Sequence, residues 1–227
     1  MPRVKKEIPK KVLISDKLGS VSILISEVKN PVAVLVLAHG AGAAMHHPFM
    51  EAVAKELEQY SIITIRYNFV YMEKKTKRPD PPAIAEKTVQ MVVNFAHDTF
   101  PDLPVFAGGK SFGGRMSSQR LSKETPEFVK GIVFLGFPLH APGKPGDERA
   151  SHLNDVKIPM LFLQGTRDAL ATMELMEGVC SKLSSATLIK FEGADHSFKA
   201  GKSNLIPVLS SSIASWVNDV LKIKKKK

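Results

Sequence analysis

Residues 105–118 of the chain read VFAGGKSFGGRMSS, and two motifs of different chemistry overlap in this stretch. The letters GKS at 109–111 are the end of a phosphate-binding loop, G-x-x-x-x-G-K-[ST]. The letters GKSFG at 109–113 also form G-x-S-x-G, a sharp turn between a strand and a helix that presents a serine hydroxyl. The first motif predicts a nucleotide-binding protein, and the second predicts a nucleophilic serine.

The phosphate-loop motif is incomplete in this sequence. It requires a glycine five residues before Gly109, and that position holds Pro104. The intervening residues, VFAG, have the pattern of a buried strand, whereas a phosphate loop needs flexible residues whose N–H groups converge on the anion. The serine turn needs small neighbours because its serine is held in a strained conformation, and glycines stand on both sides of Ser111. The sequence therefore favours the serine turn.

Strand-like and helix-like runs alternate along the rest of the chain. The predicted strands cover 21–26, 32–38, 61–67, 103–109, 131–137, 158–165 and 186–192. The predicted helices cover 48–60, 83–100, 112–123, 169–183 and 203–222, and 68–82 is predicted to be a loop. This alternation predicts an α/β fold of three layers, with a mostly parallel central sheet and helices on both faces. Functional side chains of such sheets gather in loops at the carboxyl ends of the strands.

A nucleophilic serine in this fold needs an acid after a later strand and a histidine after the last strand. Asp168 lies three residues past the glycine that ends MLFLQG, and His196 follows ATLIKFE. His196 would accept the proton of Ser111, and Asp168 would hold the imidazole in the correct tautomer. Asp195 is a weaker choice because adjacent residues of an extended chain point apart. Asp155 precedes its strand and is set aside.

Attack on a carbonyl also requires N–H donors that stabilise an oxyanion. We expect one donor to be the backbone N–H of Phe112, directly after the nucleophile. The second is expected from Ala41, in the loop AHGAGAAMHHP that follows the strand at 32–38.

Four further residues are candidates for lining the site: His39, Gly40, Phe137 and His140. We expect His39 to order its loop rather than to react, and for His140 a structural hydrogen bond is the simpler interpretation.

Two other clusters of polar residues do not indicate a specific binding site. His46 and His47 have no carboxylate or cysteine at a spacing typical of metal sites, so no metal is predicted, and triad chemistry requires no cofactor. Four cations at 74–78 could attract acidic substrates, although a solvated loop is the simpler interpretation.

Composition indicates one globular domain with charged ends. Of the formal charge of +10, residues 1–11 contribute +4 and residues 222–227 contribute +5. We expect a basic N-terminal tail at 1–11, a single domain at 12–222 and a Lys-rich tail at 223–227. Solvated basic tails bind anions only nonspecifically, so no specific nucleic-acid partner is predicted.

Cysteine content and hydropathy bear on the compartment. Cys180 has no second cysteine to pair with, and it lies in an apolar helical pattern where a buried, inert thiol is expected. The N-terminus MPRVKKEIPKK lacks the apolar stretch of a signal peptide, and no apolar run approaches the roughly 20 residues that span a bilayer. The sequence predicts a cytoplasmic protein without a membrane span, and it leaves open whether the protein is a monomer or a homodimer.

With HGAGA, GKSFGGR, GTRDAL and GADHSF in place, the chain resembles the α/β-hydrolase superfamily over nearly its whole length. The segments RYNFVYM, KRPDPP and FPLHAPGKP look like those of small cap-less bacterial hydrolases related to the KANL-like and testis-expressed α/β-hydrolase domains. The resemblance implies a triad of Ser111, Asp168 and His196. The chain is also similar in size to dienelactone hydrolases, but those have a cysteine where this chain has Ser111, so their substrate is not carried over.

Larger relatives insert a cap after the strand at 131–137, and here only residues 138–157 separate this strand from the next. We therefore expect no large cap and an open site roofed by 138–157 and by 68–82. The resulting hypothesis is a serine hydrolase that cleaves a small-molecule carboxylic ester or thioester through an acyl-enzyme. Two alternatives stay open. One is an amide or peptide hydrolase with the same triad, and the other is a non-catalytic interaction or scaffold protein.

Overall fold

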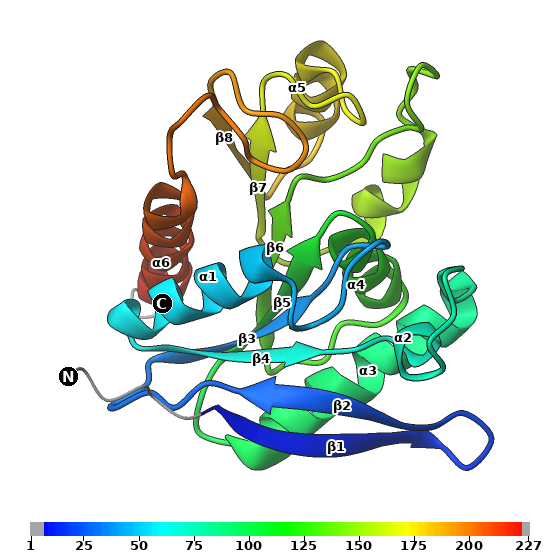
Figure 1. The fold of residues 1–227 in the computed structure, drawn as a ribbon. Helices are drawn as coiled ribbons and strands as arrows, with labels where there is room; N and C mark the ends of the chain where they lie inside the picture. The colour runs from blue at the N-terminus through cyan, green and yellow to red at the C-terminus, as the bar shows by residue number, and fades with distance from the viewer. Residues whose placement is uncertain (1–6, 224–227) are drawn as a thin grey trace.

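The computed structural model describes residues 7–223, which form a central sheet covered by helices (Figure 1). The strands are β1 (Ile8–Ser15), β2 (Gly19–Ile25), β3 (Ala33–Ala38), β4 (Ile62–Tyr67), β5 (Val105–Lys110), β6 (Val129–Leu135), β7 (Met160–Gly165) and β8 (Ala186–Phe191). The α-helices are α1 (Pro48–Leu57), α2 (Val70–Glu73), α3 (Pro82–Thr99), α4 (Phe112–Lys123), α5 (Met173–Ser181) and α6 (Ile206–Ile223). Two 3₁₀ helices are η1 (Glu58–Tyr60) and η2 (Glu148–Asp155).

The sheet confirms the predicted α/β fold. Its strand order is β1-β2-β4-β3-β5-β6-β7-β8, in which the pairs β1–β2 and β2–β4 are antiparallel and every pair from β4–β3 to β7–β8 is parallel. The chain moves outward from β3 to β4 and then returns to the other side of β3 as β5. The direction of winding therefore reverses between β3 and β5, and ligands of open α/β sheets bind outside the carboxyl ends of strands at such a point.

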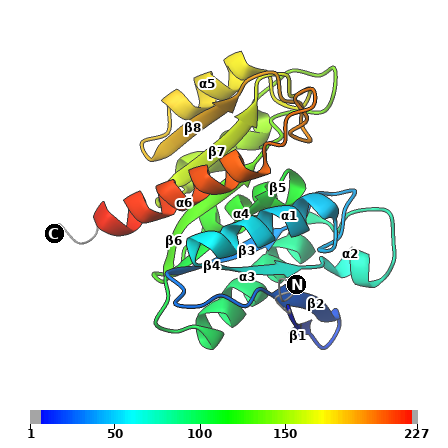
Figure 2. The same ribbon diagram turned by 60° about the vertical axis from the view of Figure 1, so that its left-hand side comes forward.

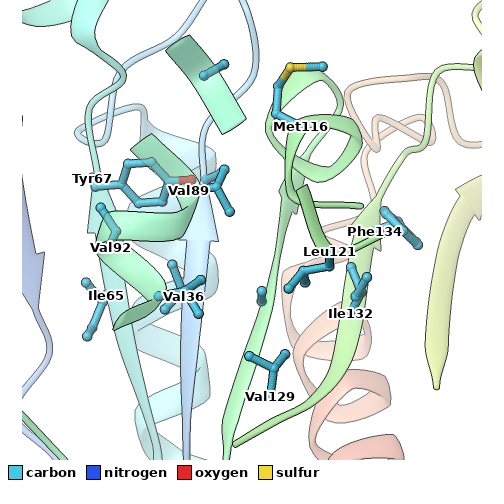
Figure 3. Close-up of a cluster of buried hydrophobic side chains, with 14 of the residues drawn as sticks. Val36, Ile65, Tyr67, Val89, Val92, Met116, Leu121, Val129, Ile132 and Phe134 are labelled. Atoms are coloured by element: carbon cyan, nitrogen blue, oxygen red, sulfur yellow. The ribbon is translucent and has the colours of Figure 1, made fainter. Parts of the chain in front are cut away.

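Helices cover both faces of the sheet, as Figure 2 shows for α1 and α6 on the face turned toward the viewer. The side chains of α1 and α6 pack with β3 and β6 in one buried cluster, and those of α3, α4 and α5 pack in a second cluster on the opposite face. Figure 3 shows part of the second cluster, where Val89 and Val92 of α3 lie beside Val36 and Ile65. Within residues 7–223, no helix has both the length and the apolar character needed to cross a bilayer.

Every strand and helix predicted from the sequence is present, whereas β1, α2 and η2 were not predicted. Residues 8–15 form β1, so Lys10 and Lys11, assigned to the basic tail, are strand residues. This edge strand buries little more than Val12 and Ile14, and its exposed lysines are typical of a protected sheet edge. The loop predicted at 68–82 contains the short helix α2. The tail residues 1–6 and 224–227 lie outside the described part of the chain.

Cys180 lies on α5, and it is partly rather than fully buried. Burial raises the pKa of its thiol to about 12. The thiolate, which is the reactive form of cysteine, is therefore scarce at neutral pH, as expected for an inert structural thiol.

The middle of the sheet depends on a glycine in β5. A Cβ added to Gly108 would stand 2.0 Å from the carbonyl oxygen of Val133 on the neighbouring strand, a contact that only a backbone shift relieves. We expect Gly108→Ala to lower the free energy of unfolding by at least about 3 kcal/mol, measured by urea denaturation. Gly178→Ala is the control, because nothing lies within 4 Å of that Cβ and alanine favours the helix α5 by up to about 1 kcal/mol. Equal urea midpoints for Gly108→Ala and the unmodified protein would contradict the argument.

Candidate active site

Ser111 lies at the sharp turn between β5, which ends at Lys110, and α4, which begins at Phe112. Its φ of 50° and ψ of −113° are unusual for a residue with a side chain, as expected for a strained nucleophile turn. The turn is possible because the helix packs closely on β3: a Cβ on Gly113 would stand 2.6 Å from the carbonyl oxygen of Ala38. Glycine at this position lets α4 start immediately after the serine.

His196 joins the serine to a buried carboxylate. Its Nε2 lies 2.9 Å from Ser111 Oγ, and its Nδ1 lies 2.7 Å from Asp168 Oδ2. Because a carboxylate only accepts, Nδ1 carries the proton that it donates to Asp168, and the lone pair of Nε2 faces the serine hydroxyl. The structure thus brings together three residues that lie up to 85 positions apart in the sequence, in the order of contacts that a serine nucleophile requires.

The carboxylate of Asp168 is held on both oxygens. Gln164, a buried residue of β7, donates from Nε2 to Asp168 Oδ2 at 2.6 Å, and the backbone N–H of Leu170 donates to Oδ1 at 2.8 Å. The side chain of Asp168 is fully buried. Asp195 Oδ1, by contrast, accepts backbone N–H groups of its own loop from Ser197 and Lys199. Asp195 therefore shapes the loop that carries His196, while Asp168 contacts the imidazole.

The loop after β3 lies beside Ser111 and is fixed by His39. His39 is fully buried, and burial lowers its pKa to about 4, so the ring is neutral at neutral pH. Its Nδ1 donates to Gly40 O at 2.8 Å, and its Nε2 accepts the N–H of Phe69 at 3.2 Å. Because the N–H and C=O of a trans peptide point in opposite directions, the N–H of Ala41 is directed away from the His39 ring.

Tyr71 of α2 holds the same loop by a second hydrogen bond. Its hydroxyl donates to Ala41 O at 2.7 Å, and Asn68 Oδ1 accepts the N–H of Met45 at 3.0 Å at the far end of the loop. Arg66, a buried side chain of β4, also donates to the carbonyl oxygen of Met45. The backbone next to Ser111 is therefore held by side chains of β4 and of the segment that follows it.

A cavity of about 320 Å³ opens at the triad. Its lining residues are Gly40, Ala41, Gly42, Ala43, His47, Phe49, Met50, Lys110, Ser111, His196 and Ser197. Gly40 lines it as predicted, whereas His39 lies behind the loop. Neither Phe137 nor His140 is among the described residues that line this cavity. The prediction of a roof formed by 138–157 and 68–82 was wrong, because no residue of either segment lines the cavity.

The chain turns away from the cavity at the end of β6. Gly136 has a φ of +71°, and the ring of the following residue, Phe137, packs in the core against Phe134 and Phe162. His140 is buried as well, and its Nδ1 lies 2.9 Å from Ala141 O. This is the structural hydrogen bond that was the simpler interpretation of His140. His46 and His47, the two histidines considered as metal ligands, have different surroundings. His47 caps α1 by accepting the N–H of Phe49, and His46 is exposed.

Sequence reasoning missed Gln164 and Tyr71. A signal for Gln164 existed, because an amide at the end of the otherwise apolar run MLFLQG needs a hydrogen-bonding partner once it is buried. Tyr71 gave no signal, since its partner Ala41 is 30 positions away and the contact is to a backbone oxygen.

Comparison with known proteins identifies the fold. A family model described as alpha/beta hydrolase domain matches residues 31–220. Among solved structures, the chain is similar to a dienelactone hydrolase from Anabaena variabilis, with a TM-score of 0.76 and 20% identity over 93% of this chain and 96% of the other. An alpha-beta serine hydrolase homologue from Coxiella burnetii superposes with a TM-score of 0.73 and 20% identity, over 90% and 97% of the two chains. At these identities the superpositions show a common fold.

A third similar structure is an α/β serine hydrolase without lid from Xanthomonas campestris, with a TM-score of 0.72 and 18% identity over 95% of this chain and 96% of the other. Its lid-less architecture agrees with the short segment between β6 and β7. The narrower resemblance to KANL-like and testis-expressed domains stays a prediction, because the family match does not distinguish them. Because the family model covers most of the chain, this protein belongs to the α/β-hydrolase family.

Proposed function

We propose that this protein is a serine hydrolase that cleaves carboxylic esters or thioesters through an acyl-enzyme, with Ser111, His196 and Asp168 as its catalytic residues. The observation that carries the proposal is the position of His196, whose two ring nitrogens lie 2.9 Å from the serine hydroxyl and 2.7 Å from a buried carboxylate. An isolated serine is a poor nucleophile at neutral pH, and a base within hydrogen-bonding distance is what activates it.

The first half-reaction transfers the acyl group to the enzyme. Ser111 Oγ attacks the carbonyl carbon while its proton passes to His196 Nε2, and Asp168 stabilises the imidazolium that forms. When the tetrahedral intermediate collapses, the bond to the leaving alcohol or thiol breaks, and the leaving group takes the proton from Nε2. In the second half-reaction water attacks the acyl-enzyme with the same base, which releases the acid and restores Ser111.

Two backbone donors are proposed for the oxyanion. Phe112 contributes an N–H from the first turn of α4, where amide hydrogens have no acceptor inside the helix. Ala41 contributes the N–H that points away from the His39 ring, in a loop held by His39 and Tyr71. Preorganised donors of this kind are worth about 3 kcal/mol each, because they need no rearrangement when the charge develops.

The proposed substrate is a small molecule, and the chemistry needs no dissociable cofactor. The cytoplasmic location remains a prediction from the lone Cys180. An amide or peptide hydrolase would use the same triad, and no observation favours it over an esterase. The scaffold alternative is less well supported, because Ser111, His196 and Asp168 are hydrogen-bonded in the order that nucleophilic catalysis requires.

The proposal is tested by covalent labelling. We expect a fluorophosphonate probe to add to the protein once and at Ser111, located by mass spectrometry of the peptides, and we expect turnover of p-nitrophenyl butyrate that the probe abolishes. The neighbouring hydroxyls Ser117 and Ser118 are internal controls, since their Oγ atoms are hydrogen-bonded within and beside α4. A folded protein that neither reacts with the probe nor hydrolyses the ester would favour the scaffold alternative.

A further inference from the structure

Lys110, the residue before the nucleophile, has no part in the mechanism above, although it lines the same cavity. Its Nζ is buried and has no hydrogen-bond partner among residues 7–223. The Nζ lies 5.6 Å from the centroid of the Phe198 ring, and a Cβ on Gly136 would stand 3.1 Å from it. A buried ammonium group costs free energy unless an anion pairs with it, so this position needs an explanation.

The carboxylates nearest to Lys110 are already engaged. Asp168 accepts hydrogen bonds from His196 and Gln164, and Asp195 accepts two backbone N–H groups of its own loop. No described carboxylate lies within 4 Å of Lys110 Nζ. Burial lowers the pKa of Lys110 to about 8, and the more distant Asp168 and Asp195 act in the opposite direction. The ammonium form therefore predominates at neutral pH with no carboxylate of the protein paired to it.

The surroundings of the cavity are cationic as well. A hollow of about 430 Å³ shares Ala41 with the cavity and is lined by Lys75 and Lys77. Another hollow, of about 480 Å³, shares Ser197 with the cavity and is lined by Lys199 and Lys202. In the described chain, the linings of the cavity and of these two hollows include lysines but no aspartate or glutamate. A cleft lined by one sign of charge concentrates ligands of the opposite sign.

We infer that Lys110 is a specificity-determining residue that pairs with a carboxylate at the end of the acyl chain, so that preferred substrates are monoesters of short dicarboxylic acids. The inference rests on the proposed function. Lys110 and Ser111 line the same cavity, so an acyl chain that is bound to Ser111 and fills this cavity lies beside Lys110 in both half-reactions. Lysine carries its charge on a four-carbon stem, which an adipoyl chain with its four methylenes matches in length. Phe49 and Met50 line the cavity and offer apolar contact to those methylenes.

The test compares two esters that differ only in charge: p-nitrophenyl hydrogen adipate and p-nitrophenyl methyl adipate. The measured quantity is the ratio of their kcat/KM values, in which any loss of folded enzyme cancels. The unmodified protein is expected to prefer the anionic ester, and Lys110→Met to lower the ratio by at least about tenfold, the factor that corresponds to about 1.4 kcal/mol. Lys110→Arg, which keeps the charge, is expected to retain most of the preference. Lys87→Met, at an exposed position of α3, is expected to leave the ratio unchanged.

The ratio should also depend on pH. Below about pH 8 Lys110 carries a proton and attracts the carboxylate, and above that pH it becomes a neutral amine. Asp168, Asp195 and His196 also face Lys110. Lys110→Met keeps all three, so a pH dependence that they cause would appear in that variant as well. The preference for the anionic ester is therefore expected to fall as pH rises through about 8 in the unmodified protein and to stay flat in Lys110→Met.

A binding measurement separates failure of this inference from failure of the proposed function. In Ser111→Ala, calorimetry is expected to show tighter binding of monomethyl adipate than of dimethyl adipate, and the added Lys110→Met is expected to remove the difference. If the unmodified protein hydrolyses neither ester, the proposed function fails and the binding difference decides the role of Lys110. If both esters are hydrolysed with equal kcat/KM, or if Lys110→Met leaves the preference intact, the inference is overturned while the hydrolase proposal stands.

Discussion

Ser111→Ala is expected to lower kcat for p-nitrophenyl ester hydrolysis by on the order of 10⁵-fold or more, because no other group can form the acyl-enzyme. The hydroxyl that reacts is the one that lies 2.9 Å from His196 Nε2. Removing it leaves only substrate binding and the oxyanion donors, which retain a small part of the catalysis. The residual rate is measured with high enzyme concentrations against a protein-free blank.

The comparison variant is Ser118→Ala, whose hydroxyl lies 2.8 Å from His152 Nε2 and thus also faces a histidine ring. Burial lowers the pKa of His152 to about 4. The pair of Ser118 and His152 does not include His196, which lies in the loop after β8. We expect Ser118→Ala to keep kcat within about tenfold of the unmodified protein, since the hydrogen bonds that it loses, to His152 and to Arg115 O, lie away from the cavity. Turnover that survives Ser111→Ala but not Ser118→Ala would show that the wrong serine–histidine pair has been assigned.

Asp168→Asn is expected to lower kcat by about 10⁴-fold while the protein remains folded. Three donors meet this carboxylate: the Nδ1–H of His196, the Nε2–H of Gln164 and the N–H of Leu170. An amide cannot accept at both positions, so its NH₂ group must face one of these donors. If the NH₂ group faces the imidazole, the imidazole changes its tautomer: Nδ1 becomes the acceptor and Nε2 carries the proton. Nε2 then has no lone pair to receive the proton of Ser111. The loss should appear in kcat at saturating ester, with the thermal midpoint recorded by circular dichroism as the check on folding.

Asp195→Asn is the matched control for the choice of acid, because it changes the residue next to His196 in the same way. Its Oδ1 accepts only backbone N–H groups, which the oxygen of an amide can also accept. A loss of about tenfold or less is expected, corresponding to a weakened loop. An Asp195→Asn variant as inactive as Asp168→Asn would mean that the loop geometry, rather than the carboxylate on the imidazole, decides activity.

The active-site elements could be predicted because each follows a local rule. Alternating runs predict a parallel sheet, and the glycines around Ser111 permit the sharp turn after which a helix starts at once. Asp168 and His196 were found because both follow strands whose carboxyl ends meet at one edge of the sheet. The edge strand β1 was missed because its basic residues look like a solvated tail until β2 pairs with it.

The sequence by itself determined the fold class and the three candidate catalytic residues, because periodicity, glycine placement and strand order are all carried by neighbouring residues. Only the tertiary structure decided what surrounds them. Gln164 supports the carboxylate, and Tyr71 holds the loop at Ala41, through contacts between segments distant in the chain. The same holds for Phe137, which the turn at Gly136 directs into the core, and for Lys110, whose charge is left unpaired by the packing around it. Side-chain direction and burial depend on how elements pack against each other, and local sequence does not encode that packing.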